Sequence, residues 1–266
     1  MNKSASHQIF YFSGTGNSLW SAKKIAEIIK GHDPAATCEL HNMGSAVKSE
    51  KLIIEAQAVI IVFPSYAYDL PLAVRRFVKK AVFITPYIAS FVTFGSSPMG
   101  TLGAMRRILR KKGVEKLFFG RIAAVENYLA LFGPPKPAVL ERRLVLQKEA
   151  SEEAGRAVVE RRVNRVHMFT PLSSMVAFLF YCGTKIFYKR YRLGKNCNGC
   201  GVCEKICPVS AIVMKEGRPV FTKQCEHCQG CVNLCPLRAI RFGRVKHGTP
   251  GYRHPEIALQ ELSDRR

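Results

Sequence analysis

Cysteine is nearly absent from most of this 266-residue chain: before residue 197 it occurs only as Cys38 and Cys182. Small secreted proteins that depend on disulfides distribute their cysteines over the whole fold, so this sequence does not fit that class. The other eight of its ten cysteines fall between residues 197 and 235, which favours a metal site kept in a reducing compartment. We expect Cys38 and Cys182 to be buried apolar thiols.

Long hydrophobic runs are also missing. The most apolar segment, 168–188, is interrupted by polar residues and a proline, and its longest unbroken stretch, 175–182, is far shorter than the ~20 residues that a bilayer requires. We therefore predict an apolar linker helix at 166–190 and no transmembrane segment. The N-terminus has no secretory signal, so we expect a cytoplasmic protein. Peripheral contact with a membrane surface stays open, because four basic residues accompany the apolar stretch: Lys185, Lys189, Arg190 and Arg192.

Acidic residues are scarce. The chain has 19 Asp and Glu against 41 Lys and Arg, which gives a formal net charge of +22 at pH 7. Such an excess is either a solvated basic surface or a binding surface for an acidic partner protein, a nucleic acid or anionic lipid. We find no motif of stacking aromatic residues that would indicate nucleic-acid binding. We therefore expect no nucleic acid and favour an acidic redox partner protein.

Apolar segments alternate with amphipathic ones in the first 165 residues. The run AVIIVF at 58–63 is continuously apolar, as in parallel strands that are covered on both faces. The pattern predicts strands at 7–13, 37–43, 58–63, 87–94 and 117–125, and helices at 17–30, 72–80, 100–112 and 139–163. This alternation predicts an α/β doubly wound parallel sheet.

The cysteine-rich region is an internal repeat with a period of 28 residues. Residues 197–212 read CNGCGVCEKICPVSAI and residues 225–240 read CEHCQGCVNLCPLRAI. Each copy has the spacing C-x2-C-x2-C-x3-C-P of iron–sulfur proteins, in which the fourth cysteine ligates the cluster of the other copy. Zinc sites, the competing interpretation, usually combine two C-x2-C knuckles instead.

This spacing predicts two [4Fe–4S] clusters with crossed ligation. The first is expected to use Cys197, Cys200, Cys203 and Cys235, and the second Cys225, Cys228, Cys231 and Cys207. We expect the clusters to be shielded by Ile206, Ile212, Leu234 and Ile240. His227 stands between two ligands and is expected to be a polar surface residue or a hydrogen-bond donor rather than a ligand. The region resembles bacterial two-cluster ferredoxins over its whole length.

A loop rich in glycine and hydroxyl side chains joins the first predicted strand to the first predicted helix: Ser13, Gly14, Thr15, Gly16, Asn17 and Ser18. A Walker loop would need a lysine that is missing here, and a Rossmann fingerprint would need a third glycine where Leu19 stands. The remaining interpretation is a loop that binds a monophosphate with hydroxyls and backbone N–H groups at a helix N-terminus.

At this loop the chain resembles flavodoxins, and over nearly its whole length it resembles the flavodoxin–ferredoxin fusion proteins of anaerobic bacteria. The resemblance implies a sheet of order 2-1-3-4-5 that binds FMN at the carboxyl ends of its strands. Two further loops would flank the flavin ring: Pro64, Ser65, Tyr66 and Ala67 with an aromatic face, and Gly95 and Ser96 with backbone contacts. Unlike most flavodoxins, the chain has no acidic cluster in the Gly95 loop. Residues 126–128 and 251–255 also resemble segments of the fusion family, and we assign them no role.

These observations predict a flavodoxin-like FMN-binding domain at 1–165, the linker helix at 166–190, a small α+β two-cluster ferredoxin domain at 191–245 and a C-terminal tail at 246–266. The expected function is electron transfer between the two clusters and FMN, which needs no acid–base residue. The alternative is an iron–sulfur flavoenzyme that reduces a small molecule such as a quinone or a nitro compound.

Overall fold

Five parallel strands form the main sheet of the computed structural model, which describes residues 6–166 and 171–263. The strands are β1 (His7–Tyr11), β2 (Cys38–Asn42), β4 (Ala58–Pro64), β6 (Tyr87–Phe94) and β7 (Lys116–Ala123). They lie in the order β2-β1-β4-β6-β7, which is 2-1-3-4-5 when these strands are numbered along the chain. The predicted α/β doubly wound sheet is therefore confirmed, and its strand order is flavodoxin-like.

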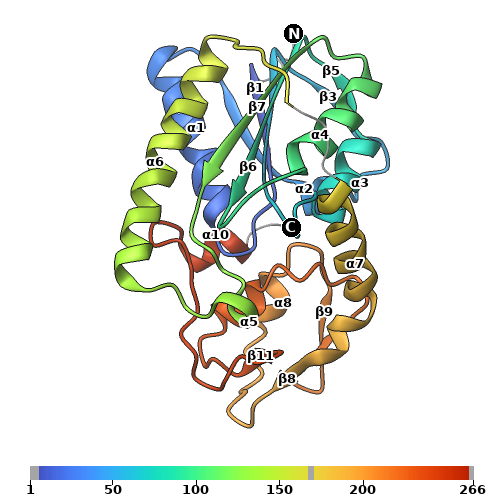
Figure 1. Cartoon of the computed structure of the whole chain (residues 1–266), viewed down its shortest axis with the longest axis vertical. Coiled ribbons are helices and arrows are strands. Elements are labelled where there is room, and N and C mark those ends of the chain that lie inside the picture. The colour runs from blue at the N-terminus through green and yellow to red at the C-terminus, as the bar shows by residue number, and fades with distance from the viewer. Residues whose placement is uncertain (1–5, 167–170, 264–266) are drawn as a thin grey trace.

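Helices cover both faces of this sheet (Figure 1). Ile9 and Tyr11 of β1 pack into a core with α1 (Asn17–His32) and α6 (Pro137–Val159). Phe10 and the following Phe12 pack into a second core with α3 (Leu72–Lys80) and α4 (Thr101–Leu109). Because successive side chains of a strand point to opposite faces, a strand covered on both sides must be apolar at nearly every position, as β4 is. The short α2 (Met43–Ala46) and the 3-10 helix η1 (Arg110–Lys112) lie in the connections.

A second, two-stranded parallel sheet consists of β3 (Ile53–Glu55) and β5 (Val82–Ile84). The sequence pattern did not predict it. Each of these strands has only three residues, and Ile53 and Val82 are more than half exposed. Runs this short and this exposed carry no usable hydrophobic period.

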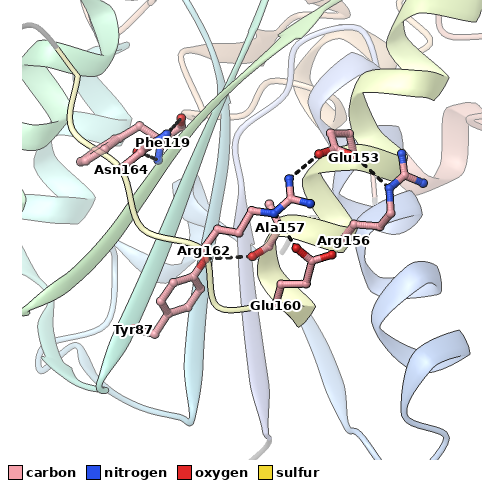
Figure 2. Close-up of polar contacts among 8 residues, drawn as sticks. All are labelled: Tyr87, Phe119, Glu153, Arg156, Ala157, Glu160, Arg162 and Asn164. Carbon is pink, nitrogen blue, oxygen red and sulfur yellow. Dashed lines mark hydrogen bonds and ion pairs between the residues drawn. The ribbon is translucent and has the colours of Figure 1, made fainter.

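The end of α6 is fastened to the main sheet by polar contacts (Figure 2). Tyr87 of β6 donates its hydroxyl to the carbonyl of Ala157 over 3.3 Å. Asn164 pairs with Phe119 of β7, donating to its carbonyl and accepting from its N–H, both over 2.9 Å. The helix ends at Val159, earlier than predicted. Arg161 has a positive φ of 52°, and this conformation does not continue a right-handed helix.

The two sequence copies in the cysteine-rich part have the same local structure. The first contains α8 (Val202–Lys205) and β9 (Ile212–Lys215). The second contains α9 (Gly230–Leu234) and β11 (Ile240–Phe242), which begin 28 residues later than their counterparts. β9 forms an antiparallel hairpin with β10 (Arg218–Phe221), and β11 pairs antiparallel with β8 (Tyr191–Leu193). The repeat in sequence is thus also a repeat in structure.

Helix α7 (Pro171–Phe187) and the 3-10 helix η2 (Tyr188–Arg190) run along the outer edge of the molecule, from the sheet toward the cysteine-rich part (Figure 1). Residues 167–170 of the predicted linker helix lie outside the described residues. Cys182 is exposed on α7 and Cys38 is only partly buried, so the prediction that both are buried is wrong. Within 6–166 and 171–263, no helix is long and apolar enough to cross a membrane.

Both parts of the chain contribute side chains to the core of the other. Ile257 and Leu262, the latter on α10 (Leu259–Ser263), are buried in the core that α1 and α6 form. In the opposite direction, Leu129 of α5 (Leu129–Phe132) is buried among residues of the cysteine-rich part. The sheet and the cysteine-rich part are therefore packed together and not merely tethered.

Candidate functional site

The eight predicted cluster ligands lie around two separate hollows. One is lined by Cys197, Cys200, Cys203 and Cys235, and the other by Cys207, Cys225, Cys228 and Cys231; we name these the first and second cysteine sets. Each set takes three cysteines from one repeat and the fourth from the other, which is the crossed arrangement expected of two-cluster proteins. Among the described residues, no three His, Cys, Asp or Glu side chains converge as they would around a single metal ion.

The fourth cysteine of each repeat is held by the same backbone bond. The N–H of Ala211 donates to the sulfur of Cys207 over 3.1 Å, and the N–H of Ala239 donates to the sulfur of Cys235 over 3.3 Å. Both alanines are buried, which gives the recurring alanine in the two copies a structural reason. Backbone N–H groups aimed at ligand sulfurs are also a means of setting cluster potentials.

The hollows are unfavourable places for a thiolate that has no positive partner. Desolvation raises the pKa of Cys203 to about 11 and raises that of Cys231 well above its usual range. Metal ligation requires the thiolate, and the ionised form in such a site needs a nearby cation. Two sets of four cysteines with crossed membership fit iron–sulfur clusters.

Two of the four predicted shielding residues lie elsewhere. Ile212 and Ile240 border the second and first hollows, but Ile206 and Leu234 pack into the core beneath α1 and α6. The prediction that His227 is a surface residue is also wrong, because it is only 2% exposed and its ring lies 5.1 Å from that of Phe242. The packing of the sheet against the cysteine-rich part buries these residues.

A cavity of about 410 Å³ lies at the carboxyl ends of the main-sheet strands. Loops after β1, β4, β6 and β7 line it, together with residues of α5 and α7 and with His227. Sheets of this order bind their ligands at this edge, and the volume is ordinary for a ligand pocket. Of the twelve residues proposed to contact FMN, eleven line the cavity. Gly16 does not, and it instead lies against His254 and Ile257 of the tail.

The 13–18 loop presents a helix N-terminus to this cavity. Helix α1 begins at Asn17, after Gly16 in the left-handed conformation with a φ of 108°. The first N–H groups of a helix have no partner inside it, and the first turn of α1 has no acidic residue. The hydroxyl residues Ser13, Thr15 and Ser18 are buried here. N–H groups that have no partner within their helix, together with buried hydroxyls, fit a phosphate group when they lie at one end of a cavity.

Tyr66 is presented by a strained turn. Tyr66 and Asp69 exchange two backbone hydrogen bonds of 3.0 Å, and the residues between them, Ala67 and Tyr68, have φ angles of 47° and 67°. A left-handed φ costs a residue with a side chain about 1–2 kcal/mol, and such strain is concentrated at functional sites. Both tyrosines line the cavity, where an aromatic face fits a planar ring.

Residues 126–128 join the cavity to the cysteine-rich part. Asn127 donates its side-chain amide to the Thr15 hydroxyl over 2.7 Å, and its carbonyl accepts from Asn233 over 3.0 Å. Glu126 occupies the space beside Gly95, where an added Cβ would lie 2.8 Å from the Glu126 Cβ. An acidic side chain thus lies beside the Gly95 loop, although the loop itself contains none. Sequence reasoning missed this because the residues are far apart in the chain.

The tail holds the 13–18 loop from behind. Tyr252 donates its hydroxyl to Oδ1 of Asn17 over 2.6 Å, and the N–H of His254 donates to the carbonyl of Thr15 over 2.9 Å. The amide group of Asn17 donates to the carbonyl of Val125 over 2.9 Å. The side chain of Asn17 borders the cavity but is engaged by protein groups, so it orients the loop rather than being free for a ligand.

His254 makes the docking of the tail sensitive to pH. Its ring is 1% exposed and stacks 4.8 Å from that of Trp20. Burial lowers the pKa of His254 from 6.5 to about 4, and the nearby Glu256 opposes this shift. The undocked tail would take up a proton below pH 6.5, whereas the docked tail would not until about pH 4. We therefore expect the free energy of tail docking to become less favourable by up to about 3 kcal/mol as the pH falls from 6.5 to about 4.

The emission of Trp20, the single tryptophan of the chain, measures this loss between pH 7 and 4.5. We expect Trp20 emission to change with pH in the wild type and to change much less in the His254→Gln variant. His32, exposed at the end of α1, provides the matched His32→Gln control, which should keep the wild-type change. An unchanged pH profile in His254→Gln would contradict the assignment.

The second cysteine set lies directly against the 13–18 loop. A Cβ added to Gly14 would lie 2.9 Å from the carbonyl oxygen of Cys228, and one added to Gly230 would lie 3.0 Å from the carbonyl oxygen of Gly14. Only residues without a side chain allow backbones to approach this closely. His227, which precedes Cys228, lines the cavity itself. The cavity and the second hollow therefore share a wall.

An ion pair with a buried carboxylate lies on the other side of this wall. Glu226, whose side chain is 3% exposed, accepts from Arg76 of α3 over 2.8 Å. Burial raises the pKa of Glu226 to about 7, while Arg76 and the N–H groups of Leu72 and Ala73 act to lower it. These N–H groups lie in the first turn of α3, where a carboxylate complements the helix dipole. Glu226 thus attaches the loop of the second set to the main sheet.

Comparison with known proteins agrees with the two parts. A family model described as a 4Fe-4S dicluster domain matches residues 189–246, and no curated protein matches the chain. Among solved structures, an FMN-dependent NADH-azoreductase from Bacillus anthracis is 10% identical, with a TM-score of 0.42 over 58% of this chain and 99% of its own. Megasphaera elsdenii flavodoxin is 18% identical, with a TM-score of 0.35 over 57% of this chain and 99% of its own.

These structural similarities are too weak to carry an argument, and the fold assignment depends on the strand order of the chain itself. That order is flavodoxin-like, and the cysteine-rich part matches a 4Fe-4S dicluster domain, a kind of cofactor defined by its redox chemistry. The chain is therefore a redox electron-transfer protein in which a flavodoxin-like fold is fused to a ferredoxin-type 4Fe–4S dicluster domain.

Proposed function

We propose that the protein relays electrons between two [4Fe–4S] clusters, held by the two cysteine sets, and an FMN in the cavity. When bound, the clusters accept or release single electrons and the flavin exchanges one or two, so together they connect one-electron with two-electron chemistry. The residues of the chain hold these groups at fixed positions. No side chain needs to act as an acid or a base.

The contact between Gly14 and Cys228 carries this proposal. Gly14 belongs to the loop that fits the phosphate, and Cys228 belongs to the second cysteine set. The two backbones touch, and the Arg76–Glu226 pair holds the same loop against α3. A purely structural role for the iron–sulfur part would not require a loop of cysteine ligands to lie against the cavity, whereas electron transfer between the two sites would.

The arrangement supports an order for the relay. The second set shares its wall with the cavity, whereas Cys200 of the first set is exposed. We therefore assign the first set to exchange with an external partner and the second to exchange with the flavin. Five exposed basic residues lie within two positions of residues that line the first hollow: Lys195, Lys205, Lys215, Arg218 and Arg238. This charge supports an acidic redox partner protein, because complementary charge speeds association.

Anaerobic purification followed by iron, sulfide and flavin analysis tests the proposal. We expect about eight irons and eight sulfides for two [4Fe–4S] clusters, and about one FMN, per chain. Two zinc ions without flavin would overturn both cofactor assignments. Iron at the expected level without FMN, even after incubation with excess FMN, would overturn the relay and leave only the clusters.

An iron–sulfur flavoenzyme is the second candidate. Apolar side chains of α5 and α7, among them Leu131, Phe132, Val176 and Phe180, line the same cavity as the loops that fit the flavin. They would suit an apolar substrate over the flavin ring. Steady-state reduction of a quinone or a nitro compound by the purified protein would favour this candidate, and transfer only in the presence of a protein partner would favour the relay.

A further inference from the structure

Helix α7 exposes a continuous apolar stripe. Met175, Phe178, Leu179 and Ile186 are 56%, 67%, 61% and 57% exposed, and Cys182 between them is exposed as well. Steps of three, four and seven residues place these side chains on one face of a helix. Exposed apolar side chains are ordinary when they occur singly, but a contiguous patch marks an interaction surface. We call these five side chains the α7 stripe.

The opposite face of α7 is fixed against the protein. Ala177 is buried, Val176 and Phe180 line the cavity, and Tyr181 donates its hydroxyl to the carbonyl of Leu70. The helix therefore cannot rotate to hide the stripe without breaking these contacts. Figure 1 shows α7 at the outer edge of the molecule, with no other element outside it in this view.

The charged residues that neighbour α7 along the chain are all basic. The sequence has no Asp or Glu between Glu160 and Glu204, although it has several Lys and Arg there. Arg165 precedes the helix and is exposed, and Lys189 and Arg190 directly follow it and are exposed as well. An apolar face bordered by Lys and Arg complements a surface that is apolar below and anionic above, as a membrane with acidic lipids is.

The length of α7 decides how it would meet a membrane. It has 17 residues, and no helix of the described chain is long and apolar enough to span a bilayer. We propose that α7 lies flat on an anionic lipid surface, with the α7 stripe in the interface and the flanking cations at the headgroups. Leu131 and Phe132, which line the cavity together with Val176 and Phe180, are 72% and 53% exposed.

Co-sedimentation of the cofactor-loaded protein with vesicles tests this. We expect binding to phosphatidylcholine vesicles that contain about one-third phosphatidylglycerol to be at least about tenfold stronger than to pure phosphatidylcholine, and to weaken with added salt. The double variant Phe178→Glu/Leu179→Glu should lose at least about tenfold in binding. The matched control is Val139→Glu/Val145→Glu, which places the same charge on two exposed positions of α6 and should bind like the wild type.

Three outcomes would overturn the proposal: no binding of the wild type, equal binding of the Phe178→Glu/Leu179→Glu variant, or equal loss in both double variants. Gel filtration tests whether a second copy of the chain, rather than a membrane, covers the α7 stripe. A wild-type dimer that becomes monomeric in Phe178→Glu/Leu179→Glu, without vesicle binding by either form, would show that a second copy of the chain covers the stripe. Iron and flavin content, unchanged in both variants, confirms that the fold is intact.

Discussion

Replacing Cys207 with serine is expected to remove the cluster of the second repeat and to leave that of the first. Cys207 lies in the first repeat, but it lines the hollow of Cys225, Cys228 and Cys231. Loss of one ligand from a buried set leaves a cluster with three cysteines, which lowers its stability. We expect the iron content of Cys207→Ser to fall from about eight to about four per chain.

Double variants show which cluster is lost without any spectral assignment. Cys207→Ser combined with Cys228→Ser removes two ligands of one set, so the iron content should stay at about four. Cys207→Ser combined with Cys200→Ser removes one ligand from each set, so it should fall toward zero. If Cys207 served its own repeat, the two results would be exchanged. Cys182→Ser, at an exposed cysteine outside both sets, is the control and should keep about eight irons.

Replacing Gly251 with alanine is expected to release the tail. An added Cβ would lie 2.6 Å from the carbonyl carbon of Asn233, and this obstacle is backbone that cannot rotate away. Moving the tail breaks the bond from the N–H of Tyr252 to Oδ1 of Asn233 and that from the Tyr252 hydroxyl to Asn17, of 2.9 and 2.6 Å. Two such hydrogen bonds contribute about 2 kcal/mol to the free energy of tail docking. We expect FMN to bind at least about tenfold more weakly, because the 13–18 loop loses its support.

Flavin release on dilution, followed by the fluorescence of free FMN, measures this effect, and limited proteolysis reports the tail directly. Gly31→Ala is the matched control, because a Cβ there meets nothing within 4 Å. It should retain flavin and protease resistance like the wild type. A Gly251→Ala variant with both properties intact would show that the loop does not depend on the tail.

The fold was predictable where a residue's role is set by its near neighbours. The continuous apolar run of β4 and the alternation of strands with amphipathic segments predicted the main sheet. The repeated cysteine spacing predicted the two sets, because ligand geometry depends on short distances along the chain. The 13–18 loop was also readable, since a strand, a glycine-rich turn and a helix N-terminus are consecutive.

Features that depend on distant contacts were not predictable. Tyr252 and Asn17 are 235 residues apart, and nothing in either segment indicates the other. His227 is buried by aromatic side chains that include Phe180 of α7, so its surroundings exist only after the parts have packed together. The pair β3 and β5 was missed because three residues do not show a period. The sequence therefore predicted the cysteine sets and the 13–18 loop separately, but not the contacts that join them.

The support of the 13–18 loop by the tail has a consequence for how the protein matures on the ribosome. The loop emerges early in synthesis, but Tyr252 and His254 emerge only after every cysteine of both sets. On its way to the loop the tail packs Gly251 and Tyr252 against Asn233, and Asn233 lies between Cys231 and Cys235. We expect loading of the flavin to follow insertion of the clusters, so that a chain lacking iron does not retain a flavin that could react with oxygen unproductively.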